Sequence, residues 1–483
     1  MVPFRTIIGL EVHVELLTNS KMFCRCKNEP FGVEPNTNVC PVCMGLPGTL
    51  PTPNKEAVRK TIMVGKALGS TIPKLSKWDR KHYFYPDLPK GYQISQYDLP
   101  FCVGGKIELL ADDGSVDSTV RFIRAHLEED AGKLFHGGRP GYSQVDYNRA
   151  SVPLLEMVSE PDMTSAAQAR RFLQEVQLLA RTLGVSDADM EKGMMRCDVN
   201  VNISFPELGK GRTPITEIKN VNSSRAVERS ITYEAQRQYD EWMAGGPIRT
   251  RVHKLTVGWD ENKEILVMQR AKEEANDYRY MPEPDLPPVE VYKDRELNPD
   301  NIVLPELPND RRRRYLKLGI SMAETDVLIG DPIRVAYLEK CLDLKIKLPR
   351  TVVNWLINAP GCVVLSPEVT VQLIEMATQG SVSFSALKPR LTELSELLVG
   401  KANGDLFLSL QSLALLQIHD ASVVELAIAD VLKECPEQVR DYKSGNERIF
   451  GFLVGQVMKR TAGKAQPAKV SEALKQAIEI VKQ

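Results

Sequence analysis

The chain has 483 residues, of which 43% are hydrophobic, and its 62 Lys and Arg residues nearly balance its 63 Asp and Glu residues to give a net charge of -1. This length exceeds what one hydrophobic core usually organises and predicts a soluble protein of roughly three domains. The balanced charge excludes nucleic-acid binding through overall positive charge, so any such contact must use local basic patches.

The compartment is predicted from the hydropathy pattern and the cysteines. No apolar run approaches the roughly 18 residues of a membrane span, and a strand pattern begins within a few residues of Met1. We therefore expect neither a membrane helix nor a signal or transit peptide. The nine cysteines are an odd number and four of them lie between residues 24 and 43, which favours a cytoplasmic, metal-binding protein over a disulfide-bonded one.

The first predicted element is a strand over residues 7–16, in which polar and apolar residues alternate strictly. Alternation puts Glu11, His13 and Glu15 on one face and the leucine and valine side chains on the other. A core strand thus displays a possible reaction face.

Four cysteines follow in two pairs, Cys24-x-Cys26 and Cys40-x-x-Cys43, with thirteen residues between the pairs. This spacing allows two short knuckles to bring four thiolates together around a tetrahedral zinc ion. The alternatives are a redox dithiol and chance clustering, but a redox pair does not need a second pair at this distance. We therefore predict a structural zinc knuckle at residues 24–43.

Residues 78–97 interleave cationic and aromatic side chains, and include Lys81, Tyr83 and Tyr85. Such a mixture is used to stack nucleobases and to neutralise phosphates. The equal alternative is a loop held by half-buried tyrosines whose hydroxyls find polar partners.

Two further segments repeat the pattern of the first strand. Residues 120–130 align Arg124, His126 and Glu128 on one face, and Glu129 and Asp130 follow where the strand should end. We expect this strand to present its polar face near that of residues 7–16.

Residues 196–204 likewise place Asp198 on a polar face, together with asparagines and a serine. The acids Glu11, Glu128, Glu129 and Asp198 suit Mg²⁺, which prefers oxygen ligands, and His13 would bond a coordinated water. For any single acid the alternative is a solvated or ion-paired surface group, which is the commoner fate of a carboxylate. Their predicted common location favours the metal site.

The pattern changes along the chain indicate an α+β fold followed by helices. Antiparallel strands are predicted up to about residue 292, with helices over 164–183 and 224–243. Proline-rich runs then mark a boundary near residue 294, and helical patterns follow to about 400 and again beyond 403. We predict domains at 1–293, 294–403 and 404–483.

Two common catalytic motifs are missing from the sequence. It contains no G-x-x-x-x-G-K-[ST] loop, so ATP binding cannot be predicted from a phosphate-cradling motif, and no G-x-S-x-G elbow, which argues against a serine hydrolase.

Several long motifs nevertheless resemble one family, the B subunits of the aspartyl/glutamyl-tRNA(Asn/Gln) amidotransferase, GatB. The similar segments cover nearly the whole chain and occur in the family's order. They are residues 9–16 (GLEVHVEL), 79–87 (DRKHYFYPD), 126–133 (HLEEDAGK), 146–149 (DYNR), 155–162 (LEMVSEPD), 195–202 (MRCDVNVN), 217–223 (EIKNVNS), 277–285 (DYRYMPEPD) and 451–459 (GFLVGQVMK).

The resemblance implies a cradle-like catalytic domain with an antiparallel sheet, an all-helical domain and a small helical, YqeY-like tail that binds tRNA. It implies a glutamine-dependent amidotransferase, a carbon-nitrogen ligase, in a heterotrimer with the amidase (A) subunit, which hydrolyses glutamine, and the small (C) subunit. ATP would phosphorylate the side-chain carboxylate of misacylated Glu-tRNA(Gln) or Asp-tRNA(Asn). Ammonia, derived from glutamine by the amidase, would then displace the phosphate.

The resemblance also implies roles for individual residues. It carries a Mg²⁺ site onto Glu11, His13, Glu128 and Glu129, to which the strand pattern adds Asp198. Lys81, Tyr83 and Tyr85 would position the aminoacylated adenosine. Zinc at Cys24, Cys26, Cys40 and Cys43 would stiffen the fold, because family members also function without the complete set.

Two other functions fit the residues. One is a noncatalytic tRNA-binding scaffold, and the other is a metal-dependent phosphohydrolase that uses the carboxylate cluster. ATP turnover that depends on Glu11 and Glu128 would exclude the scaffold, and phosphate release that requires misacylated tRNA would argue against the phosphohydrolase.

Overall fold

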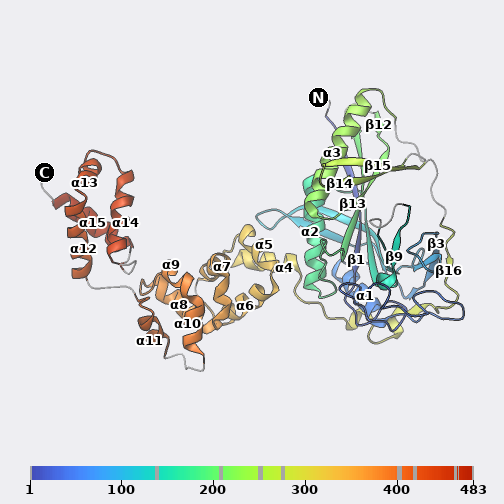
Figure 1. Ribbon diagram of the computed structural model, residues 1–483, viewed down its shortest axis with the longest axis horizontal. Coiled ribbons are helices and arrows are strands. Elements are labelled where there is room, and N and C mark those ends of the chain that lie inside the picture. Colours follow the sequence, from blue (N-terminus) through green and yellow to red (C-terminus); the bar gives the residue numbers. More distant parts are fainter. Residues whose placement is uncertain are drawn as a thin grey trace. The chain divides into compact units, whose positions relative to one another are not determined.

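The computed structural model describes residues 3–135, 141–205, 210–247, 254–272, 278–346, 348–399, 405–416, 421–461, 465 and 467–480. The chain forms two compact units, Met1–Arg311 and Arg312–Gln483 (Figure 1). Among the described residues, no helix is both long enough and apolar enough to cross a membrane.

The first unit is built on a ten-stranded sheet whose main path is β15-β14-β13-β11-β1-β10-β7-β5, with β12 paired to β11 and β6 paired to β7. The three predicted polar-faced strands are confirmed as β1, β11 and β7, and β10 lies between β1 and β7. The strands are β1 (Arg5–Glu15), β5 (Cys102–Val103), β6 (Lys106–Leu110), β7 (Val116–Glu129), β10 (Pro153–Ser159), β11 (Met195–Phe205), β12 (Lys210–Arg212), β13 (Ile215–Val221), β14 (Lys254–Asp260) and β15 (Ile265–Lys272).

One strand pair departs from the predicted antiparallel sheet. Strands β13 and β14 are parallel, whereas the other described pairs of this sheet are antiparallel. A parallel pair needs a crossover connection, and here helix α3 (Ser224–Met243) lies between the two strands in the sequence. The sheet is therefore mixed at this position.

The helices of the first unit cover the apolar face of the sheet. Helix α2 (Ala166–Thr182) and helix α3 confirm the two predicted helices, and their N-caps Ser165 and Ser223 accept hydrogen bonds from the first turn. Together with α1 (Lys55–Ala67), they share one hydrophobic core with the Leu and Val side chains of β1. The opposite face is left to the polar side chains.

Short sheets complete the first unit. They comprise β3 (Asp79–His82), β4 (Tyr92–Ser95) and β16 (Met281–Pro282), then β2 (Leu75–Ser76) with β17 (Val289–Glu290), then β8 (Lys133–Phe135) with β9 (Gln144–Asp146). Strands β3 and β16 are paired although about 200 residues of sequence separate them. Met281 is the partner of Arg80 in this pair.

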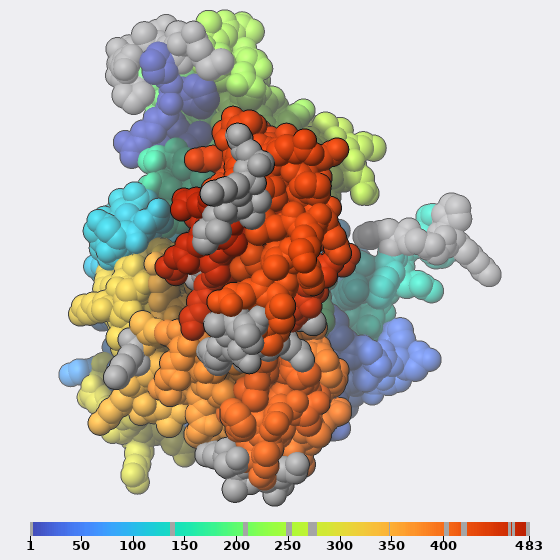
Figure 2. All heavy atoms as spheres, turned by 90° about the vertical axis from the view of Figure 1, so that its left-hand side faces the viewer, coloured from blue at the N-terminus to red at the C-terminus, as the bar shows by residue number. Residues whose placement is uncertain are grey.

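The regular elements among the described residues of the second unit are helices, joined by loops and one isolated β-bridge between Val382 and Leu416. Helix α7 confirms the helix predicted to begin at Pro349. Helices α12–α15 form a hydrophobic core of their own, and Figure 2 shows them as one body of red atoms. The three predicted domain boundaries stay predictions. The helices are α4 (Pro308–Lys317), α5 (Met322–Ile329), α6 (Pro332–Asp343), α7 (Pro349–Asn358), α8 (Pro367–Thr378), α9 (Phe384–Leu387), α10 (Leu391–Leu398), α11 (Leu406–Ser412), α12 (Ala421–Glu434), α13 (Pro436–Lys443), α14 (Arg448–Arg460) and α15 (Pro467–Ile480).

Candidate active site

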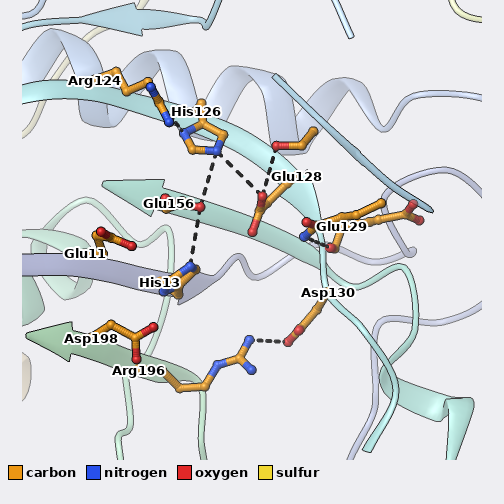
Figure 3. A network of polar contacts seen from close by, with 12 residues as sticks. Glu11, His13, Arg124, His126, Glu128, Glu129, Asp130, Glu156, Arg196 and Asp198 are labelled. Atoms are coloured by element: carbon orange, nitrogen blue, oxygen red, sulfur yellow. Dashed lines mark hydrogen bonds and ion pairs between the residues drawn. The ribbon is translucent and has the colours of Figure 1, made fainter. Parts of the chain in front are cut away.

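Two rows of side chains cross the polar face of the sheet over strands β7, β10, β1 and β11 (Figure 3). Antiparallel register aligns residues of the four strands, and alternation aims their side chains to the same face. From β7 to β11, the first row consists of Arg124, Val158, Glu11 and Asp198. The second row consists of His126, Glu156, His13 and Arg196. The fold thus brings together Glu11, His13 and Asp198, as predicted from alternation.

The first cluster, which we call the histidine triad, consists of His13, Glu128 and Glu156. One ligand atom of each residue lies within 4.8 Å of the others. The Nε2 atom of His13 is 3.4 Å from Glu156 Oε2, and Ser95 Oγ donates a 3.0 Å hydrogen bond to Glu128. Three strands and the end of β4 therefore position one nitrogen and two carboxylates for a single cation.

His126 encloses the histidine triad from β7. Its Nε2 atom lies 3.4 Å from Glu156 and 3.6 Å from Glu128, and Arg124 Nε lies 3.3 Å from its Nδ1 atom. Burial lowers the pKa of His126, but Glu156 and Glu128 raise it to about 9, so the ring is protonated at neutral pH and its Nε2–H faces the two carboxylates.

Burial and neighbouring charge oppose each other in the histidine triad. Burial raises the pKa of Glu156, but His126 and His13 hold that pKa well below its ordinary value. Burial and Glu156 raise the pKa of Glu128, yet His126 and Lys81 bring it below its ordinary value. Burial lowers the pKa of His13, but its hydrogen bond to Glu156 has the opposite effect, and the pKa is raised overall. Both carboxylates thus stay ionised and attract positive charge.

The second cluster, the carboxylate triad, consists of Glu11, Asp198 and Glu217, again with ligand atoms within 4.8 Å of one another. Asn200 donates a 2.9 Å hydrogen bond to Glu11. The ammonium of Lys219 lies 2.5 Å from Asp198 and 3.5 Å from Glu217. Three carboxylates with an amide beside them are oxygen ligands suited to Mg²⁺.

Glu129 is not brought into either triad. Its side chain points to the other face of β7, where Lys90 Nζ lies 2.5 Å from its carboxylate and the backbone N–H of Ile94 donates to it at 2.9 Å. Adjacent residues of a strand face opposite sides, so Glu128 and Glu129 cannot both reach His13. The Mg²⁺ role predicted for Glu129 has no support in this geometry.

The sequence matches the model of the GatB/GatE catalytic domain over residues 6–296 and the model of the GatB domain over residues 336–478. It is 43% identical over 490 residues to the B subunit of the aspartyl/glutamyl-tRNA(Asn/Gln) amidotransferase of Thermomicrobium roseum, with 99% of each chain covered. It is 42% identical to the protein of the same name from Persephonella marina, with 98% of this chain and 99% of the relative covered. The chain belongs to the GatB/GatE family. The family resemblance read from the motifs is confirmed.

Lys81 and Tyr83 lie at the edge of the histidine triad of this GatB/GatE chain. The Nζ atom of Lys81 is 5.1 Å from the centre of the Tyr278 ring and 5.9 Å from that of Tyr83. Burial lowers the pKa of Lys81, but Glu128 and Glu156 raise it above its usual value. Tyr85, in contrast, is 57% exposed and lines an open hollow with Lys90.

The four predicted zinc ligands converge in the structure. Cys24, Cys26, Cys40 and Cys43 place their sulfur atoms within 4.8 Å of one another. The thiol of Cys24, hydrogen-bonded to Cys43, lowers the pKa of Cys43 to about 5 despite its burial. The fully buried Lys21 places its Nζ atom 3.9 Å from Cys43 Sγ. Four sulfurs at this separation, with a thiolate among them, fit tetrahedral zinc.

A pair of buried acids lies beyond the histidine triad. Burial and the nearby Asp130 raise the pKa of Glu15 to about 8, whereas Arg196 and Arg149 hold the pKa of Asp130 below its ordinary value against its burial. Arg196 Nη2 lies 2.5 Å from Asp130. Glu15 therefore retains its proton while Asp130 is charged.

Glu156 and Glu217, one in each triad, were not predicted from the sequence. Glu156 lies in a strand whose residues are buried on both faces, so its segment shows no polar alternation. Glu217 and Lys219 do alternate with buried residues in β13, and that signal was available.

Proposed function

We propose that this chain uses ATP to activate the side-chain carboxylate of glutamate or aspartate misacylated onto tRNA(Gln) or tRNA(Asn), and then converts it to the amide. The proposal is supported by the two triads on one face of the sheet, which are built around His13 and Glu11 in adjacent rows. His13 and Glu11 are two residues apart, so the triads are separated by roughly 7 Å along β1. The relatives are named as B subunits of an amidotransferase, which supports the same reaction.

The reaction needs activation because the oxygen of a carboxylate is a very poor leaving group. An oxygen of the substrate carboxylate attacks the γ-phosphorus of ATP, the bond to the bridging oxygen breaks, and ADP leaves with the electron pair. Ammonia then attacks the acyl carbon, inorganic phosphate leaves, and the lost proton goes to a base. The product is Gln-tRNA(Gln) or Asn-tRNA(Asn).

The residues of the polar face match the first step. The histidine and carboxylate triads would hold Mg²⁺, which offsets the negative charge of the phosphates during transfer. Lys81 is charged, lies beside Glu128 and Glu156, and is held between tyrosine rings, so it would bind the substrate carboxylate or its ester. With Tyr83 it would position the terminal aminoacylated adenosine, and the exposed Tyr85 would contact the same acceptor end from outside.

Other parts of the assembly are proposed on the same basis. Ammonia would come from glutamine through the amidase (A) subunit, with the small (C) subunit making up the rest of the complex, since the relatives are named as B subunits. The helical tail, residues 404–483, would bind the tRNA. Nine free thiols in the structure fit a reducing compartment, the cytoplasm.

The decisive experiment measures amidation of Glu-tRNA(Gln), and separately of Asp-tRNA(Asn), by the chain co-purified with its partners, with ammonium and Mg²⁺, with and without ATP. We expect amidation that requires ATP. The variants Glu11→Gln and Glu128→Gln should lower it about 100- to 1,000-fold, because each loses one ligand of a triad. Glutaminase activity of the partner should persist.

The matched control is Glu290→Gln, which changes a carboxylate that is 55% exposed and paired with Lys293. It should amidate like the wild type. Full amidation by Glu11→Gln or Glu128→Gln would refute the metal assignment. Tight tRNA binding without amidation or phosphate release would instead favour a scaffold.

We also propose that the cysteine quartet holds one structural zinc ion. Elemental analysis of protein purified without chelator should give about one zinc per chain. Cys43→Ser should lose it and unfold at lower temperature, whereas Cys102→Ser, which changes a buried cysteine outside the quartet, should keep it. Fully folded, metal-free wild-type protein would contradict the zinc proposal.

A further inference from the structure

The cations of the polar face differ in how they are paired. Arg196 contacts Asp130, and Lys219 contacts Asp198 and Glu217. Arg124 is half-buried on the same face and, within the described part of the chain, forms no ion pair with a carboxylate. This is unexpected because the described residues of this face include seven acids, namely Glu11, Glu15, Glu128, Asp130, Glu156, Asp198 and Glu217.

The position of Arg124 is set by its row and by His126. It is aligned with Glu11 across β10, so its Cα atom lies two strands, or roughly 10 Å, from that of Glu11. Its Nε atom lies 3.3 Å from His126 Nδ1, which fixes the base of the guanidinium and leaves its remaining N–H groups without a carboxylate among the described residues. Figure 3 shows His126 between Arg124 and Glu156.

The surface of the sheet between Arg124 and Glu11 is suited to a ligand. The residue between them in the row is Val158, whose side chain is apolar, half-exposed and too short to reach either charge. An anion above Val158 would lie between the guanidinium and the carboxylate triad. A planar guanidinium with N–H groups that no carboxylate holds matches the geometry of phosphate oxygens.

We propose that Arg124 is a catalytic residue that donates hydrogen bonds to the terminal phosphates of ATP. This inference rests on the proposed function and adds to it a residue outside both triads. As the γ-phosphorus leaves the bridging oxygen and bonds to the substrate carboxylate, negative charge moves onto the departing ADP. Arg124 would stabilise that charge from the side opposite the carboxylate triad without exchanging a proton.

The competing role for Arg124 is to orient His126 beside the histidine triad. The two roles predict different measurements on the complex with its partner subunits. A phosphate contact predicts that Arg124→Ala lowers the ATP-dependent amidation rate about 100-fold or more and leaves Mn²⁺ affinity unchanged. It also predicts that free guanidinium ion restores part of the lost rate and that Arg124→Lys retains part of it, since a positive charge returns to the same place.

The matched control is Arg121→Ala, which removes another arginine of β7 that is 64% exposed and paired with Asp162. It should behave as the wild type. Wild-type rate and KM for ATP in Arg124→Ala would overturn the proposal. So would lower Mn²⁺ affinity without guanidinium rescue, or a raised KM for aminoacyl-tRNA alone. A wild-type complex that amidates without ATP would remove the proposed function itself, and this role with it.

Discussion

The histidine triad and the carboxylate triad lie side by side on one face of the sheet but have different surroundings. The side chains of Glu128 and Glu156 are 3% and 10% exposed, and their partners are His13, His126 and Ser95. The side chain of Asp198 is 22% exposed and its partner is the long side chain of Lys219. The enclosed triad is thus organised before a ligand arrives, whereas a cation at the open triad must compete with an ammonium.

The largest difference should appear when one acid of each triad is changed. Glu156→Gln should lower the free energy of unfolding by about 2 kcal/mol, because two histidines lose their buried charged acceptor. It should also reduce amidation about 100-fold or more. Asp198→Asn should reduce amidation but change stability by less than about 1 kcal/mol, because its side chain is 22% exposed and its partner Lys219 is 36% exposed.

Urea denaturation in chelator, together with ATP-dependent amidation, measures both quantities. Equal loss of stability in the two variants would contradict the contrast between an enclosed and an open triad.

Glu15, a buried acid on the same face, allows the effect of burial to be tested through the pH dependence of stability. Burial and Asp130 raise the pKa of Glu15 to about 8, above its value in the unfolded chain. At pH values below the pKa of Glu15 in the unfolded chain, Glu15 is protonated in both states and does not lower the free energy of unfolding. As pH rises toward 8, the unfolded chain releases its proton and the folded chain does not, so stability falls.

Glu15→Gln removes that loss. At pH 5 it should change the free energy of unfolding by less than about 1 kcal/mol, and by pH 8 it should raise this free energy by about 4 kcal/mol relative to the wild type. Denaturation of chelator-treated protein at both pH values measures the difference. A stability difference that does not change with pH would show that Glu15 is ionised in the folded protein.

The smallest effect concerns the lysine of the open triad. Lys219→Met removes the ammonium that pairs with Asp198 and Glu217, so Mn²⁺ should bind the carboxylate triad about threefold more tightly. Titration followed by electron paramagnetic resonance measures this affinity. Lys263→Met, at a lysine that is 71% exposed, is the control. Unchanged affinity in Lys219→Met would mean that Lys219 does not compete with the cation.

The strand-borne part of the site could be predicted from the sequence because alternation is a local property. Glu11, His13 and Asp198 could be assigned to one face from their own segments, and β1, β7 and β11 all lie in the same sheet. Glu129 differs, since a residue adjacent to Glu128 must face the other way while the strand continues. Glu129 was expected in the metal site because the strand was predicted to end before it, and the family resemblance pointed to the same residue, but β7 continues through Glu129.

What could not be predicted depends on contacts between distant segments. Glu156 lies in a strand without alternation, and only its pairing between β1 and β7 brings it to His13 and His126. Tyr278 reaches Lys81 because β16 pairs with β3, far away in the sequence. The parallel pairing of β13 with β14 likewise follows from the crossover through α3, which no pattern within either strand specifies.

The central position of β1 restricts how its length can change in evolution. The strand is hydrogen-bonded to β10 on one side and to β11 on the other, so neither edge is free to absorb an extra residue. An insertion of one residue within it would turn His13 into the core and Val12 onto the reaction face. Insertions and deletions here should therefore be rare among relatives, even at positions where substitutions are tolerated.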